Sequence, residues 1–231
     1  MKKIAGILLS IALILTLTAC NSGLYAQLDK TMAANGHKDL NDLRMDDTQR
    51  GMFADLASSE RNGEITHIVL HFMSNVIANP VNPYIIADIE RIFQNYGVSA
   101  HYIIDREGNI HPAVPEDRVA FHAGMGTLVD FPEYEDRLNE YSIGIELLGI
   151  GTQEEMALFL TACEYQALDP ALIGFTDAQY DALNWLLNDI LARHPGIRPN
   201  RTHIIGHDEY APDKPDPGAL FEWERLDFMM N

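Results

Sequence analysis

Two pairs of histidines stand four residues apart, His67 with His71 and His203 with His207. On a helix, this spacing with a glutamate in between would indicate a zinc protease. The intervening residues here are Ile-Val-Leu and Ile-Ile-Gly, which favour strands and include no glutamate, so that interpretation fails. On a strand, His71 ends an apolar element, where the edge of a sheet can hold a metal ligand rigidly.

A carboxylate stands inside a second apolar stretch. Glu146 lies between Ile145 and Leu147 in the sequence SIGIELL, residues 142–148. An unpaired carboxylate at such a position is costly, so it needs either a cationic partner or a chemical role. The residues alone leave both interpretations open.

The elements that would position these side chains alternate between strands and helices. Runs of β-branched residues predict strands, and apolar residues at helical spacing predict helices. The expected strands are 65–72, 101–104, 109–114, 142–148 and 201–206, and the expected helices are 84–96, 154–168, 176–194 and 219–229. This pattern predicts a single α/β domain over residues 51–231, with a mixed central sheet flanked by helices.

Local signals refine this prediction. Gly97 suits the position just after a helix, and Thr176 with Gln179 forms a capping box that opens one. Residues 105–108 join two strands as a hairpin turn. Gly144 marks a place where another group comes close to the backbone.

Six segments carry a more specific pattern: Ile68–His71, Ser99–Asp105, Phe121–Gly124, Ser142–Glu146, Phe175–Gln179 and Gly206–Gly218. In this order they resemble the type 2 N-acetylmuramoyl-L-alanine amidases, whose fold is shared by amidase-type phage lysozymes and peptidoglycan recognition proteins. The resemblance covers roughly residues 64–226. It implies zinc-dependent hydrolysis of the amide bond between N-acetylmuramic acid and L-alanine in peptidoglycan or muropeptides.

The resemblance also implies a set of site residues. His71, His207 and Asp216 would bind zinc and leave one position open for the water that the metal acidifies. Glu146 would act as general base and then as the acid that protonates the leaving alanine nitrogen. Lys214 would stabilise negative charge on the attacked carbonyl oxygen, or would be a solvent-facing loop residue.

Two further histidines fall within these segments. His122 is expected to line the substrate groove near the sugar or the peptide, with a structural role as the alternative. His101 suits a hydrogen bond in the core better than a zinc ligand. The segment 151–174 is longer than in the minimal core of the family and could form one wall of the cleft.

The N-terminus resembles a lipoprotein signal peptide. Lys2 and Lys3 precede a weakly polar run, 4–19, that ends at Cys20. Leu-Thr-Ala-Cys resembles the lipobox, which implies a lipid on Cys20 and an extracytoplasmic, membrane-anchored bacterial lipoprotein. An ordinary signal peptide is the alternative. Residues 21–50 are then expected to form a tether.

The net charge of −18 argues against nucleic acid as a partner, and against adhesion to anionic membranes through a basic patch. Membrane contact is therefore expected through the lipid, and contact with the cell wall through a specific cleft. The protein is expected to be a monomer. Two other functions stay open. One is a noncatalytic peptidoglycan-binding module of the same fold, and the other is a zinc hydrolase that acts on a different amide.

Overall fold

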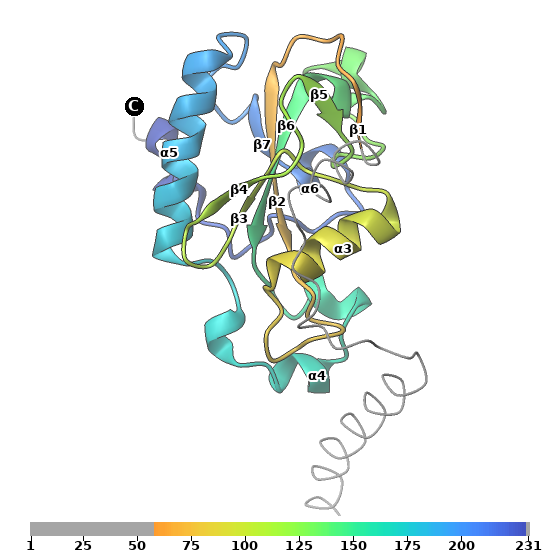
Figure 1. The fold of residues 1–231 in the computed structure, drawn as a ribbon, viewed down its shortest axis with the longest axis vertical. Helices are drawn as coiled ribbons and strands as arrows, with labels where there is room; N and C mark the ends of the chain where they lie inside the picture. The colour runs from red at the N-terminus through yellow and green to blue at the C-terminus, as the bar shows by residue number, and fades with distance from the viewer. Residues whose placement is uncertain (1–57, 230–231) are drawn as a thin grey trace, which may run out of the picture. The chain divides into compact units, whose positions relative to one another are not determined.

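A five-stranded sheet forms the centre of the computed structural model, which describes residues 58–229 (Figure 1). Its order is β4-β3-β6-β2-β7, with β4 antiparallel to β3 and the other neighbours parallel. The bounds are β2 (His67–Met73), β3 (Tyr102–Ile104), β4 (Ile110–Pro112), β6 (Ser142–Leu148) and β7 (Ile204–Gly206). The predicted mixed α/β class is confirmed.

Each face of the sheet is covered by a different helix (Figure 1). The helix α5 (Asp177–Arg193) packs on the face that carries Ile68, Ile143 and Ile145, where Leu183 and Ile190 are fully buried. The helix α3 (Ile86–Tyr96) packs on the opposite face through Ile89 and Phe93, against Ile103 and Leu148. The second face also carries the polar side chains of the site.

The predicted helix boundaries hold where the sequence has clear caps. The Thr176 hydroxyl accepts a hydrogen bond from the Gln179 amide, and the Gln179 side-chain oxygen accepts one from the Thr176 amide. Gln179 also donates to the carbonyls of Ile104 and Leu148, which anchors the start of α5 to two strands. Gly97 ends α3 in the left-handed conformation, with φ of 64°.

Two predicted helices are wrong. Residues 154–168 form two short pieces, η4 (Glu155–Leu158) and α4 (Ala162–Gln166), because Thr161 forms its own capping box with Glu164 and begins a new helix there. Residues 219–229 form the turns η6 (Trp223–Arg225) and η7 (Asp227–Met229). Between these turns, the Asn184 side chain bonds the Arg225 carbonyl and the Asp227 amide, backbone groups that a continuous helix would use itself.

Short elements complete the domain: the two-stranded ladder of β1 (Ser58–Glu60) with β5 (Arg118–Ala120), and the turns η2 (Pro132–Tyr134), η3 (Leu138–Tyr141), η5 (Pro170–Leu172) and α6 (His207–Tyr210). Across residues 58–229, every helix is too short or too polar to span a bilayer. The expected signal peptide, Cys20 and the tether lie outside the described residues.

The stretch 151–174 packs beside the loop that follows β2. Val76, Ile150, Met156 and Leu168 form a small buried cluster of their own there. Arg106 ties the stretch to the sheet by donating hydrogen bonds to the carbonyls of Leu148 and Ala171.

Candidate metal centre

The candidate site lies toward the carboxyl ends of three neighbouring parallel strands. His71 is near the end of β2, Glu146 is near the end of β6, and His207 directly follows β7 as the first residue of α6. His71 and Glu146 are partners in the parallel register, so their side chains leave the same face of the sheet. In open α/β sheets this edge is where ligands bind.

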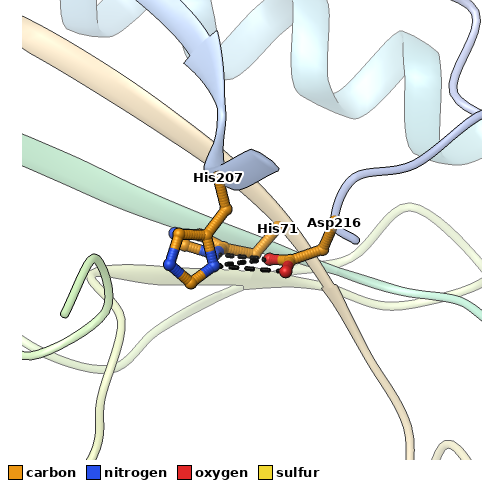
Figure 2. A group of neighbouring side chains, drawn as sticks. All are labelled: His71, His207 and Asp216. Carbon is orange, nitrogen blue, oxygen red and sulfur yellow. Dashed lines mark hydrogen bonds and ion pairs between the residues drawn. The ribbon is translucent and has the colours of Figure 1, made fainter. Parts of the chain in front are cut away.

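Two imidazoles and one carboxylate converge there (Figure 2). The Asp216 Oδ2 lies 2.8 Å from the His71 Nδ1 and 3.0 Å from the His207 Nδ1, and the two Nδ1 atoms are 3.2 Å apart. All three residues are buried, and one ligand atom from each lies within 4.8 Å of the others. Burial and the neighbouring His207 ring lower the pKa of His71, so its neutral form is favoured.

Asp216 is held in place by a hydrogen bond to its own carbonyl and by contacts of the residues that follow it. Its carbonyl accepts a hydrogen bond from the Asp208 amide at the start of α6. Just beyond it, Gly218 has φ of 78°, a conformation that favours glycine, and the Glu155 carboxylate accepts a hydrogen bond from the Ala219 amide at 2.7 Å. Burial alone would raise the pKa of Asp216, but its close contacts with the His207 and His71 rings outweigh burial and lower that pKa below its ordinary value.

Glu146 lies beside this cluster as a buried carboxyl group. Among residues 58–229, its Oε2 has no hydrogen-bond partner. Burial first, and the negative charge of Asp216 second, raise the pKa of Glu146 well above its ordinary value. A buried carboxyl group with a raised pKa suits proton transfer, because it takes up a proton more readily than an ordinary glutamate does.

His122 contacts the cluster through the ring of His71. Its Nδ1 lies 3.1 Å from the His71 Nε2, and its Nε2 lies 3.2 Å from the Ser142 Oγ. A methyl group on Gly144 would come within 2.4 Å of the His122 ring, which confirms the predicted close approach to this glycine. Contact of His122 with substrate stays a prediction, and only 8% of the residue is exposed.

The other candidate residues stand apart from the cluster. Lys214 is exposed, and within the described residues its ammonium makes no hydrogen bond or ion pair. His101 is fully buried, and its Nδ1 accepts a hydrogen bond from the Gly144 amide, as expected for a core histidine. His67 and His203 stack on each other, with ring centroids 5.1 Å apart.

Three groups around the site were not singled out in the sequence as parts of it. The Asn139 side-chain oxygen accepts hydrogen bonds from the amides of His122 and Ala123. The Ala123 carbonyl lies 3.0 Å from the His207 Nε2, and the Ser142 hydroxyl donates to the Leu138 carbonyl. These contacts depend on how loops fold back over the sheet, and the one indication of them was Gly144.

Together, the fold and the cluster define an α/β domain with a buried His-His-Asp group that could hold a metal ion. The sequence model of the type 2 N-acetylmuramoyl-L-alanine amidase family matches residues 61–219. The chain belongs to this family.

Individual relatives agree with this assignment. The 1,6-anhydro-N-acetylmuramyl-L-alanine amidase AmpD of Citrobacter freundii is 37% identical over 130 residues, a match that covers 56% of this chain and 55% of the relative. This chain thus matches about half the length of that relative. AmpD of Haemophilus influenzae is 31% identical over 70% of this chain and 80% of its own length.

A solved structure shows the same fold. Escherichia coli AmiD, crystallised with anhydro-N-acetylmuramic acid-L-Ala-D-γ-Glu-L-Lys, is 27% identical, with a TM-score of 0.51 over 74% of this chain and 64% of that one.

Proposed function

We propose that this protein is a zinc-dependent amidase that hydrolyses the bond between N-acetylmuramic acid and L-alanine in peptidoglycan or its fragments. The convergence of His71, His207 and Asp216 beside the unpaired Glu146 carries this proposal. The relatives, whose names describe this reaction, support the choice of substrate.

The three candidate ligands fit a zinc ion. Bonds of about 2.0–2.1 Å in a tetrahedral arrangement place neighbouring ligand atoms about 3.3 Å apart. The separations of 2.8, 3.0 and 3.2 Å between Asp216 Oδ2 and the two Nδ1 atoms need little change to reach this value. Two imidazoles and a carboxylate are also the donor set of catalytic zinc sites with one open position. Bound there, zinc would acidify water and polarise a carbonyl.

The protein's own groups would supply the proton transfers. Glu146 would take a proton from the attacking water as the water oxygen bonds to the lactyl carbonyl carbon of the muramic acid. When the carbon–nitrogen bond breaks, Glu146 would give this proton to the alanine nitrogen, which leaves as a free amine. Lys214, two residues before Asp216 on the same loop, would turn inward on substrate binding and stabilise the charge on the carbonyl oxygen.

The test is a digestion of purified peptidoglycan and of anhydromuropeptides by the full chain in detergent, with products identified by mass spectrometry. We expect free peptides that begin with L-alanine. They should disappear with a chelator and return when zinc is added. Binding to the wall without release of any peptide would overturn the proposal and favour a noncatalytic module.

We further propose that the chain is exported and anchored by a lipid on Cys20, as a monomer that meets its substrate outside the cytoplasm. The charged start, apolar run and lipobox-like residues support this placement. Labelling cells with a radioactive fatty acid tests it. Wild-type protein should carry the label, and Cys20→Ala should lose it, whereas an unlabelled wild-type chain would contradict the lipid anchor.

A further inference from the structure

The two candidate imidazoles face the metal site in the same way. His71 and His207 both direct Nδ1 at Asp216, and both direct Nε2 at the two-residue segment formed by His122 and Ala123. A histidine ligand must present a bare nitrogen, and the partner of its other nitrogen decides which one is bare. The partners of the two Nε2 atoms therefore decide whether the site is ready for a metal.

For His207 this partner is a backbone carbonyl. The Ala123 oxygen can only accept a hydrogen bond, so the His207 Nε2 must carry the hydrogen at their separation of 3.0 Å. In the neutral ring, Nδ1 is then the unprotonated nitrogen.

For His71 the same result comes through three linked groups. The Leu138 carbonyl accepts the one hydrogen of the Ser142 hydroxyl at 2.7 Å, so the Ser142 oxygen must accept from His122 Nε2. His122 then carries its hydrogen on Nε2, which leaves its Nδ1 to accept from His71 Nε2 at 3.1 Å. The neutral His71 ring is again bare at Nδ1, on the side of Asp216.

The segment that makes both contacts is fixed in place. The Asn139 Oδ1 accepts from the His122 amide at 3.0 Å and from the Ala123 amide at 2.8 Å. Gly144 leaves the space that the His122 ring fills, and His122 is buried. If His122 carried its hydrogen on Nδ1 instead, His71 Nε2 would have to accept it, and the neutral His71 ring would carry its own hydrogen on Nδ1, towards Asp216.

We propose that His122, through Ser142, and the Ala123 carbonyl are the positioning groups that fix both candidate metal ligands in the Nε2-protonated form, with Nδ1 directed at the metal. This inference rests on the proposed metal site. It makes His122 a buried orienting residue, and a merely structural histidine would not require one direction of hydrogen bonding.

Nitrogen NMR of the full chain labelled with ¹⁵N-histidine reads the ring hydrogens directly. We expect His122 to carry its hydrogen on Nε2 in both the metal-free and the zinc-loaded protein. In the zinc-loaded protein, the Nδ1 atoms of His71 and His207 should show the metal-bound shift. A hydrogen on the Nδ1 of His122, or zinc on the Nε2 of either ligand, would overturn the proposal.

Variants test the consequence for binding of Zn²⁺ alone, measured by competition with a chelator. Ser142→Ala and His122→Leu should weaken zinc binding roughly 10–100-fold, the usual effect of losing a partner behind a metal ligand. His122→Asn should lose less, because its Oδ1 can still accept from His71. Thr176→Ala is the control, since it removes the cap of α5 on the other face of the sheet and should bind zinc as the wild type does.

The outcomes separate the two proposals. A wild type that binds no Zn²⁺ refutes the metal site, while the metal-free NMR spectrum still decides the direction of hydrogen bonding. If the wild type binds Zn²⁺ and both Ser142→Ala and His122→Leu bind it equally tightly, the positioning role is refuted and the metal site is not.

Discussion

At the scale of single residues, the proposed chemistry depends on Glu146 being buried next to another carboxylate. The pKa of Asp216 is lowered beside the two histidines, whereas the Glu146 Oε2 has no hydrogen-bond partner within residues 58–229 and the pKa of Glu146 is raised. Two nearby carboxyl groups in different environments can thus take different roles, one as a metal ligand and one in proton transfer.

Replacing Glu146 with glutamine should separate these roles. Glutamine has nearly the same shape and cannot transfer the proton, so turnover should fall by about 10²–10⁴-fold while zinc binding persists. Peptide release and bound zinc should be measured on the same sample. A Glu146→Gln protein that still digests the substrate at the wild-type rate would rule out this role.

Removing a proposed ligand should abolish zinc binding as well as turnover. His71→Ala or Asp216→Ala leaves two of the three proposed ligands, so both zinc and activity should be lost together. Zinc is measured by elemental analysis after dialysis, and His111→Ala is the matched control because His111 pairs with Asp105 outside the cluster. Retention of one zinc per chain in Asp216→Ala would contradict the ligand assignment.

The sequence predicted the cluster but not what surrounds it. The resemblance to the amidase family implied His71, His207 and Asp216, and the structure brings them together. The link from His122 to Ser142 could not be predicted, because it depends on a loop that crosses Gly144 and on the direction of hydrogen bonds. Lys214 lies on the ligand loop but points to solvent, so its role still awaits a substrate.

At the scale of elements, the stretch 151–174 braces the loop that carries Asp216. One oxygen of Glu155 accepts from the Ala219 amide, and the other accepts from the Thr152 amide, both at 2.7 Å. The expected wall of a cleft stays a prediction, whereas this contact connects the stretch to the loop that carries Asp216.

Glu155→Ala should therefore weaken zinc binding by roughly 10-fold, because Asp216 loses part of its support. Glu154→Ala is the matched control, since Glu154 is its exposed neighbour. Titration with Zn²⁺ under chelator competition compares the two variants. Equal affinity in both would show that the loop keeps its geometry without the brace.

Elements were predictable to the extent that local signals agreed with packing. The Thr176 capping box and the run of strand formers in 142–148 were sufficient for α5 and β6. For 154–168, apolar composition suggested one helix, yet the Thr161 capping box divides it. For 219–229, tertiary bonds from Asn184 decided the backbone, and no local pattern could show them.

At the scale of the whole domain, Glu116 joins the segment before β5 to the end of α5. It accepts hydrogen bonds from Arg193, His194 and Tyr102. Burial alone would raise its pKa, but hydrogen bonds from Arg193 and His194 outweigh burial and lower the pKa of Glu116 to about 2. This group therefore stabilises the fold above its ordinary pKa of 4.5, and the stabilisation is lost as the pH falls from 4.5 towards 2.

Glu116→Gln should lose about 1.5–3 kcal/mol of unfolding free energy at neutral pH, the range for hydrogen bonds to a charged group. Its stability should also depend less on pH in the acid range. Urea unfolding followed from pH 7 to pH 2 measures both effects. Glu133→Gln, at an exposed glutamate, should follow the wild type, and parallel acid curves for all three proteins would refute the role of Glu116.

The pairing of His71 with Glu146 across β2 and β6 has a consequence for preparations of this protein. Side chains alternate between faces, so a slip of β6 by one residue would carry Glu146 to the side covered by α5. The three proposed ligands lie on other segments and would be untouched. A misregistered molecule would then hold zinc and yet be inert, so metal content would overstate the number of competent molecules in a refolded batch.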